Sequence, residues 1–190
     1  MLPNVVHVGA AKCASTWLWK VYGEHPDVYV SPDVDNLNFF VADYHRGLQW
    51  YERTYFSGAR GERAVVDMSN SYMVFGPALE RIREDLGPHV RITMTLRNPI
   101  DRAFIHCGHM QTLKRFTTEQ KMGFEQMMDV HMWQLFLMFA GPSFYGYHLD
   151  RIYDSFPAGH VKVMFYDDLV NDPSRFLSDL FTFLGVDPDF

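Results

Sequence analysis

A short stretch near the N-terminus combines a lysine, two hydroxyls and several small residues in a spacing that suits anion binding. The apolar run VVHV at residues 5–8 is followed by GAAKCAST at residues 9–16, and WLWK then opens a helical pattern. Small residues let backbone N–H groups approach an anion, a helix N-terminus adds partial positive charge, and Lys12 adds a full charge. The sequence therefore predicts a cradle for a phosphorylated or sulfated small molecule.

The position of the lysine distinguishes this loop from the commonest phosphate loop. A Walker A loop has the order G-x-x-x-x-G-K-[ST]. Here Lys12 comes three residues after Gly9 and before Ser15 and Thr16, with no glycine directly before it. This order disfavours a nucleotide kinase-like phosphotransferase, an alternative that Mg²⁺-dependent turnover of ATP would support.

A second basic side chain stands at the end of another apolar run. The segment TLRNPIDRAF covers residues 95–104, and the guanidinium fork of Arg97 can meet two phosphate oxygens at once. Asn98 is expected to cap a helix that begins at Pro99. The plainer alternative is that Arg97 pairs with Asp101. We expect Arg102 to be structural and to form ion pairs on this helix.

Apolar strands alternate with helices along the whole chain. Strands are expected over residues 5–8, 28–30, 64–66, 90–96 and 161–165, and helices over 15–22, 48–56, 77–86, from 99 onward, 117–140, 147–156 and 172–185. This alternation favours an α/β, P-loop-like three-layer fold whose central, mostly parallel β-sheet is flanked by helices. Ligands in such folds bind beyond the C-terminal ends of the strands, where Lys12 and Arg97 both fall.

Composition limits the class of protein further. The 190 residues suit a single domain, and 47% hydrophobic content with 16% aromatic content predicts a folded core. A net charge of −6 argues against a nucleic-acid partner. Cys13 and Cys107 lie far apart, no signal peptide is visible, and the apolar stretch at 132–140 is too short to span a membrane. We therefore expect a cytoplasmic protein, and the sequence leaves open whether it forms a homo-oligomer.

Two motifs together resemble a known family. KCASTW at residues 12–17 is similar to the 5′-phosphosulfate loop of PAPS-dependent sulfotransferases, and LRNPIDRAF at 96–104 resembles their 3′-phosphate motif. Four further segments occur along the chain in the same order as in heparan-type and bacterial members: NFF at 38–40, YHRGLQWY at 44–51, YGY at 145–147 and FYDDL at 165–169. The resemblance implies that PAPS is the cofactor and PAP its product. It also implies contacts to the cofactor from Ala11, Lys12, Cys13, Ala14, Ser15, Thr16, Trp17 and Arg97.

The resemblance also implies a reaction and its participants. A sulfuryl group would pass from PAPS to a hydroxyl or amine of a small-molecule or glycosidic acceptor, without a metal. Lys12 and the loop N–H groups would stabilise the negative charge that grows on the leaving phosphate oxygen. The first candidate for the general base is Asp35, followed by Asp33, with His7 and His106 as outside candidates.

Four departures from the family pattern bear on activity. Asn36 stands where heparan-type members carry the catalytic Glu, Met68 replaces an active-site Lys, and Ile105 replaces a Ser that supports the 3′-phosphate. Residues 1–190 are expected to form one domain that ends at Phe190, before the family's basic cofactor-covering segment; either the chain is truncated or that segment is absent. The alternative function is thus a catalytically impaired, sulfotransferase-like nucleotide-binding module, which turnover with any acceptor would eliminate.

Several tempting residues also have plainer interpretations. Asp35 could be an ordinary loop carboxylate, and Cys13 is better explained as a small filler than as a nucleophile. His106, Cys107 and His109 on one helix offer too few ligands for a metal. The aromatic and Met residues between 116 and 139 are expected to be mostly core, with some lining an acceptor pocket.

Overall fold

The computed structural model describes residues 1–112 and 123–190 and contains a five-stranded sheet in which every strand pair is parallel. The strand order is β2-β3-β1-β4-β5, so β1 lies in the centre and its neighbours are β3 and β4. The strands are β1 (Val5–His7), β2 (Val28–Val30), β3 (Ala64–Met68), β4 (Arg91–Leu96) and β5 (Val161–Phe165). The prediction of a central parallel sheet is confirmed, and the sheet is all-parallel rather than mostly parallel.

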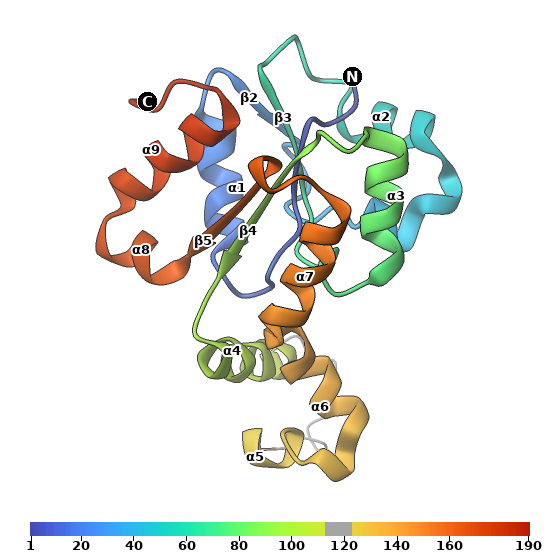
Figure 1. Ribbon diagram of the computed structural model, residues 1–190, viewed down its shortest axis with the longest axis vertical. Coiled ribbons are helices and arrows are strands. Elements are labelled where there is room, and N and C mark those ends of the chain that lie inside the picture. The colour runs from blue at the N-terminus through green and yellow to red at the C-terminus, as the bar shows by residue number, and fades with distance from the viewer. Residues whose placement is uncertain (113–122) are drawn as a thin grey trace.

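Helices cover both faces of this sheet and form two outer layers (Figure 1). On one face, Leu18 of α1 and Leu180 of α9 pack in one cluster with strand residues such as Val5. On the other face, α2, α3 and α7 pack in a second cluster around Val6 and Ile92. Neighbouring residues of β1 therefore point into opposite cores, as the two-residue period of a strand requires.

The helices begin and end close to the expected residues. Their bounds are α1 (Ser15–Glu24), α2 (Leu48–Tyr55), α3 (Gly76–Leu86), α4 (Pro99–Thr112), α5 (Phe124–Met127), α6 (Trp133–Ala140), α7 (Tyr145–Ser155), α8 (Tyr166–Asn171) and α9 (Pro173–Leu184). The sequence did not predict α8, nor the π-helical turn Phe39–Asp43 that precedes α2.

The expected helix over 117–140 is wrong within its described part, and residues 117–122 lie outside the described residues. From Phe124 onward the chain forms α5, a 3-10 turn at Val130–Met132, and α6. The break follows from Asp129, whose Oδ1 accepts a hydrogen bond from the backbone N–H of His131 at 2.8 Å. A side chain that satisfies a nearby N–H in this way competes with a continuous helix.

Helices α4, α5 and α6 form a separate group at the C-terminal edge of the sheet, directly beyond the end of β4 (Figure 1). A small core of Cys107, Met127 and Phe139 holds them together. Within the two described ranges, no helix is both long and apolar enough to cross a membrane.

Candidate anion-binding site

The loop between β1 and α1 is held at the C-terminal edge of the sheet by its neighbours on both sides. Ala10 N donates to Thr95 O at 3.0 Å, and Thr95 N donates to Gly9 O at 2.8 Å. Gly9 has a φ of 138°, and a Cβ there would lie 2.7 Å from Sδ of Met73. Only glycine combines this backbone conformation with so close an approach.

The same loop presents a concave array of backbone donors. Lys12 and Ala14 both adopt left-handed conformations, with φ values of 70° and 69°. Alternating hand turns successive N–H groups toward one point and forms an anion-binding nest. Within the described part of the chain, no N–H of residues 11–17 donates a hydrogen bond, and Ala14 offers no side-chain cap to α1. The residues present therefore fit a bound phosphate or sulfate at the N-terminus of this helix.

Three of the predicted site residues meet at the mouth of the loop. Thr16 Oγ1 donates a hydrogen bond to Oδ2 of Asp35 at 2.9 Å. Partial burial lowers the pKa of Lys12, and the nearby Asp35 carboxylate offsets part of that shift. Trp17 is 38% exposed beside them, whereas Ser15 is buried. The structure thus brings Lys12, Thr16 and Asp35 together across 19 to 23 positions of sequence.

Two other predicted residues stand apart from this group. Asp33 is exposed, and within the described residues it forms no hydrogen bond or ion pair with the loop. Burial raises the pKa of Tyr29, and the charge of Asp33 adds a small contribution in the same direction. Cys13 is fully buried, and burial raises the pKa of its thiol to about 11. A thiol that remains protonated at neutral pH is a poor nucleophile, which agrees with its interpretation as a small filler.

Arg97 stands at the opposite side of the loop, directly after β4. Its guanidinium lies 4.2 Å from the ring centroid of Tyr166, the first residue of α8, in a cation–π contact. No ion pair joins Arg97 to Asp101 in the described ranges, so the plainer alternative is not observed. Asn98 caps α4 as predicted, because its Oδ1 accepts from Ile100 N at 2.9 Å.

The expectation for Arg102 is wrong in its partners. Arg102 is fully buried, and it forms no ion pair with any described residue. Its Nε donates to Oγ of Ser143 at 2.5 Å, and its Nη2 donates to the carbonyl oxygen of Phe139. Helix α6 packs against the face of α4 that carries Arg102. The guanidinium is therefore shielded from the carboxylates of the surface, and it donates to a neutral hydroxyl and a neutral carbonyl instead.

A buried carboxylate that sequence reasoning missed lies at the end of β3. Asp67 is fully buried and accepts hydrogen bonds from Tyr51 at 2.5 Å, Tyr72 at 2.9 Å and Ser69 at 2.7 Å. Burial raises its pKa to about 6, although the three hydroxyl donors lower it in part. An acidic residue in an otherwise apolar strand, two positions before a serine, is the signal that could have found it.

The end of β3 also holds the segment that carries Asp35. Leu37 N donates to Met68 O at 2.9 Å, and Asn38 N donates to Oγ of Ser69 at 2.9 Å. Oδ1 of Asn36 accepts from the backbone N–H of Asn70 at 3.0 Å. The Asn36 side chain therefore joins this segment to the chain that follows β3, and this hydrogen bond helps to fix Asp35, the residue before it.

His7, one of the outside candidates for the base, is enclosed within the sheet. His7 is fully buried, and its Nδ1 lies 3.2 Å from Oγ1 of Thr93. Burial lowers the pKa of His7 to about 4. The described residues include no group of three or more His, Cys, Asp or Glu side chains placed to hold a metal ion.

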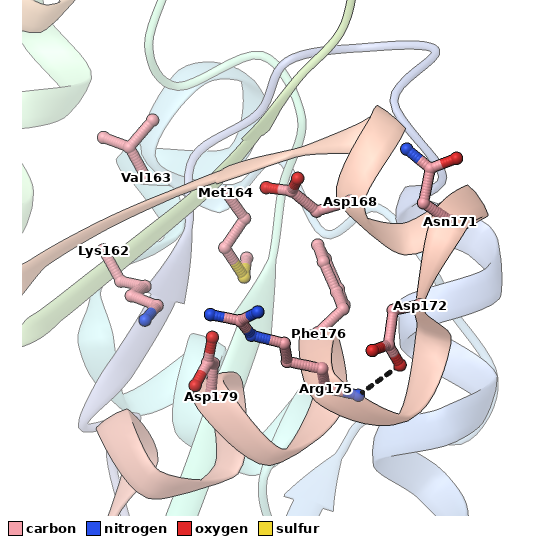
Figure 2. Close-up of a pocket in the computed structure, with 9 residues that line it drawn as sticks. All are labelled: Lys162, Val163, Met164, Asp168, Asn171, Asp172, Arg175, Phe176 and Asp179. Atoms are coloured by element: carbon pink, nitrogen blue, oxygen red, sulfur yellow. Dashed lines mark hydrogen bonds between the residues drawn. The ribbon is translucent and has the colours of Figure 1, made fainter.

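Several hollows among the described residues lie away from this loop. A cavity of about 370 Å³ lies between β5, α8 and α9. Side chains of both charges surround it, as Figure 2 shows. None of the predicted cofactor residues lines it. A second, apolar hollow of about 500 Å³ lies between α4, α5 and α6; its lining includes Phe124, Met128 and Phe136. The expectation that the aromatic and Met residues of this region are mostly core is wrong for the described ones. Only Met127 and Phe139 are buried, because α5 and α6 pack on α4 alone, and other aromatic and Met side chains line the hollow or are exposed.

Comparison with known proteins places this geometry in context. The family model described as "Sulfotransferase domain" matches residues 2–189. The chain is 27% identical to human heparan sulfate glucosamine 3-O-sulfotransferase 6, over 97% of this chain and 52% of that protein. It is 23% identical to human bifunctional heparan sulfate N-deacetylase/N-sulfotransferase 2, over 98% of this chain and 22% of that protein. The chain thus spans between about a fifth and about half the length of these curated relatives.

Solved structures of sulfotransferases are also similar to this chain. A sulfotransferase from Alicyclobacillus acidocaldarius superposes with a TM-score of 0.86 at 28% identity, covering 100% of this chain and 83% of that one. A mouse sulfotransferase complexed with PAP superposes with a TM-score of 0.62 at 18% identity, covering 96% of this chain and 59% of that one. At 18% identity the second likeness shows the fold alone.

Proposed function

Because the chain belongs to the PAPS-dependent family of sulfotransferase domains, we propose that it transfers a sulfuryl group from PAPS to an acceptor. The acceptor would offer a hydroxyl or an amine on a small molecule or a glycoside. The observation that carries the proposal is the open nest of N–H groups at residues 11–17, with Lys12 beside it. We further infer that residues 1–190 act as one domain, since the five strands, from Val5 to Phe165, belong to one sheet.

The residues around the loop would divide the contacts to the donor between them. Lys12 and the N–H groups of residues 11–17 would hold its 5′-phosphate end. Arg97 would hold the 3′-phosphate, where a guanidinium can donate two parallel hydrogen bonds. Trp17 is exposed at the loop and Tyr166 lies beneath Arg97, so both offer ring surface to a nucleobase.

The chemistry follows from the charges at the mouth of the loop. In the transfer, the bond between sulfur and the bridging phosphate oxygen breaks as the acceptor oxygen or nitrogen bonds to sulfur. Lys12 would stabilise the charge that grows on the phosphate oxygen. Asp35 would accept the proton that the acceptor loses, since its carboxylate lies at the same mouth and Asp33 does not.

A specific observation also favours the second function, a nucleotide-binding module that lacks turnover. The resemblance matches Asn36 to the glutamate of heparan-type members, and the Asn36 amide oxygen accepts a hydrogen bond from the backbone N–H of Asn70. A chain of this kind would bind PAP and fail to release PAP from PAPS with any acceptor. Measured turnover would therefore eliminate this alternative.

Calorimetric titration with PAP tests the donor site directly. We expect the wild-type chain to bind PAP with micromolar affinity. We expect Arg97→Ala to weaken binding about 10- to 100-fold, because a hydrogen-bonded charge is worth about 1.5–3 kcal/mol. Arg53→Ala is the matched control, since Arg53 is exposed on α2 and, among the described residues, hydrogen-bonds only to Gln49 of its own helix.

The outcome that contradicts the proposal is equally plain. If the folded wild-type chain binds no PAP, the proposal that this loop is the donor site is wrong. Equal loss of affinity in Arg97→Ala and Arg53→Ala would show that general charge, and not the end of β4, attracts the nucleotide.

A further inference from the structure

Two hydroxyl groups connect the buried carboxylate of Asp67 to the segment that carries the proposed base. Ser69 Oγ donates a hydrogen bond to Oδ1 of Asp67 at 2.7 Å and accepts one from the backbone N–H of Asn38 at 2.9 Å. Tyr72 Oη donates to Oδ2 of Asp67 at 2.9 Å and accepts from the backbone N–H of Phe40 at 3.3 Å. Because the carboxylate takes the single proton of each hydroxyl, the hydroxyl oxygen is turned toward the backbone donor.

The third hydroxyl on this carboxylate makes no such connection. Tyr51 Oη donates to Oδ2 of Asp67 at 2.5 Å, and no backbone N–H of the described residues donates to it. The Tyr51 ring stacks on Phe39 with centroids 4.0 Å apart, and this contact does not involve the hydroxyl. The two tyrosines therefore differ in one testable respect, because only the Tyr72 hydroxyl is bonded to the backbone that follows the proposed base.

The stretch of chain that carries these hydroxyls is fixed to the strand before the phosphate loop. Ser69 N donates to His7 O at 2.9 Å, and Met73 N donates to Val8 O at 3.0 Å. Any group that this stretch holds therefore has a set position relative to the loop. Asp35 is such a group, because the backbone after it is bonded to the two hydroxyls.

The segment around Asp35 has no regular structure of its own to fix it. Residues 31–38 lie in neither a helix nor a strand. Asn38 has a φ of 54°, and this left-handed residue turns the chain into the π-helical turn Phe39–Asp43. The N–H that Ser69 holds belongs to this turning residue. Loss of its acceptor should therefore loosen the chain close to Asp35.

We propose that Ser69 and Tyr72 are positioning residues, oriented by the Asp67 carboxylate, that hold Asp35 at the mouth of the phosphate loop. This inference rests on the proposed function, because it concerns the base of the same reaction. Ser69, Tyr72 and Asp67 are all buried, so they act through Asp35 and not by touching a substrate. A displacement of about 1 Å at a reacting group can cost about 100-fold in rate.

The two tyrosines give a matched pair of variants. Tyr72→Phe and Tyr51→Phe each remove one buried hydroxyl from Oδ2 of Asp67 and keep the ring. Release of PAP from PAPS is measured with 2-naphthol, 2-phenylethylamine and methyl glucoside as acceptors. We expect kcat to fall about 10-fold in Tyr72→Phe and to stay within about threefold of the wild type in Tyr51→Phe. The affinity for PAP should stay within about threefold in both, and thermal melting checks that both are folded.

A double-mutant cycle separates positioning from a general loss of packing. Ser69→Ala should lower kcat about 10-fold in the wild type and less than about twofold in an Asp35→Asn background, where there is no base to position. The melting temperature should fall equally in the two backgrounds, because the hydrogen bonds of Ser69 are lost in both.

Hydrogen exchange of the unliganded chain tests the hold on the segment without a nucleotide or an acceptor. Relative to the amides of β3, the amide of Asn38 should exchange at least about 10-fold faster in Ser69→Ala than in the wild type. In Tyr51→Phe it should stay within about threefold.

The outcomes separate this inference from the proposed function. A wild-type chain that releases no PAP with any of the three acceptors overturns both. If the wild type turns over, the same fold loss from Ser69→Ala in both backgrounds overturns the positioning role alone. Equal losses of kcat in the two tyrosine variants do the same, as does an exchange rate of Asn38 that Ser69→Ala leaves unchanged.

Discussion

The two sides of the phosphate loop carry opposite charges, and each has a buried ionisable group without an ionic partner among the described residues. On the acidic flank, formed by Asp35 and Asp67, three hydroxyls satisfy the buried carboxylate of Asp67. On the basic flank, formed by Arg97 and Arg102, a carbonyl, a hydroxyl and an imidazole satisfy the buried guanidinium. Neutral partners fix the geometry of a charge without cancelling its field.

This difference teaches how one loop can serve two chemical tasks. The basic flank leaves net positive charge where an anionic donor would lie. The acidic flank leaves a carboxylate, Asp35, where an acceptor could lose a proton, and Asp67 lies behind it in the hydroxyl network. The two flanks are therefore not interchangeable, and substitutions in each should affect different measurements.

The largest expected effect is on the stability of the acidic flank. Asp67→Ala would leave the hydroxyls of Tyr51, Tyr72 and Ser69 without their acceptor. Each buried, unsatisfied group costs about 1–3 kcal/mol, so we expect a loss of about 4 kcal/mol in the free energy of unfolding. Urea denaturation measures this loss. Asp67→Asn, which keeps an acceptor oxygen, should recover at least half of it, and equal losses in the two variants would contradict the network.

The next largest effect is expected on turnover, from substitution of Lys12 in the loop between the two flanks. Lys12→Ala should lower the rate of PAP release from PAPS about 100- to 1,000-fold with any acceptor that the wild type uses, since one preorganised donor is worth about 2.7–4 kcal/mol. The free energy of unfolding should hardly change. Lys20→Ala, exposed on α1, is the control. Near-wild-type turnover in Lys12→Ala would contradict the proposed mechanism.

The pH dependence of stability sharpens the contrast between two buried groups. The pKa of Asp67 is raised from 3.8 to about 6, so its contribution to stability is complete below about pH 4 and is lost as the pH rises through 6. The pKa of His7 is lowered from 6.5 to about 4, so its contribution is complete above pH 6.5 and is lost as the pH falls through 4. These two contributions oppose each other in the same pH range.

The difference between wild type and Asp67→Asn isolates the carboxylate, because His7 is present in both. Relative to the variant, the wild type should lose about 2.4 kcal/mol between pH 4 and pH 7, since each pKa unit corresponds to about 1.4 kcal/mol and the shift is not fully expressed within these limits. Denaturation curves at a series of pH values measure this. A difference that stays constant with pH would show that Asp67 has no raised pKa.

The smallest effect distinguishes the two flanks by function. Asp35→Asn should lower turnover about 100-fold, the lower end of the range for a general base, while the affinity for PAP stays within about threefold. Arg97→Ala should do the opposite and weaken PAP binding first. Parallel calorimetry and rate measurements on the two variants decide this. If Asp35→Asn turns over like the wild type, the base lies elsewhere.

Local chemistry alone determined much of this protein. The strand, small-residue loop and helix at residues 5–24 follow from apolar runs and small side chains that act on their neighbours in the chain. The Asn98 cap follows in the same way, because its hydrogen bonds reach only two and three residues along the chain. Each strand follows from its own apolar run, and the parallel pairing was expected from the alternation of strands and helices. The expected placement of Lys12 and Arg97 at strand ends needed only the alternation of strands and helices.

Packing between distant segments decided the rest. Tyr51 and Asp67 lie 16 residues apart and meet only because α2 covers the end of β3. Arg102 was expected to pair with local carboxylates, but α6 buries that face of α4 and supplies the carbonyl of Phe139, 37 residues away. Which face of a helix is buried depends on what packs against it, and sequence spacing along one helix carries no information about that partner. The charge of each flank therefore arises from the tertiary structure.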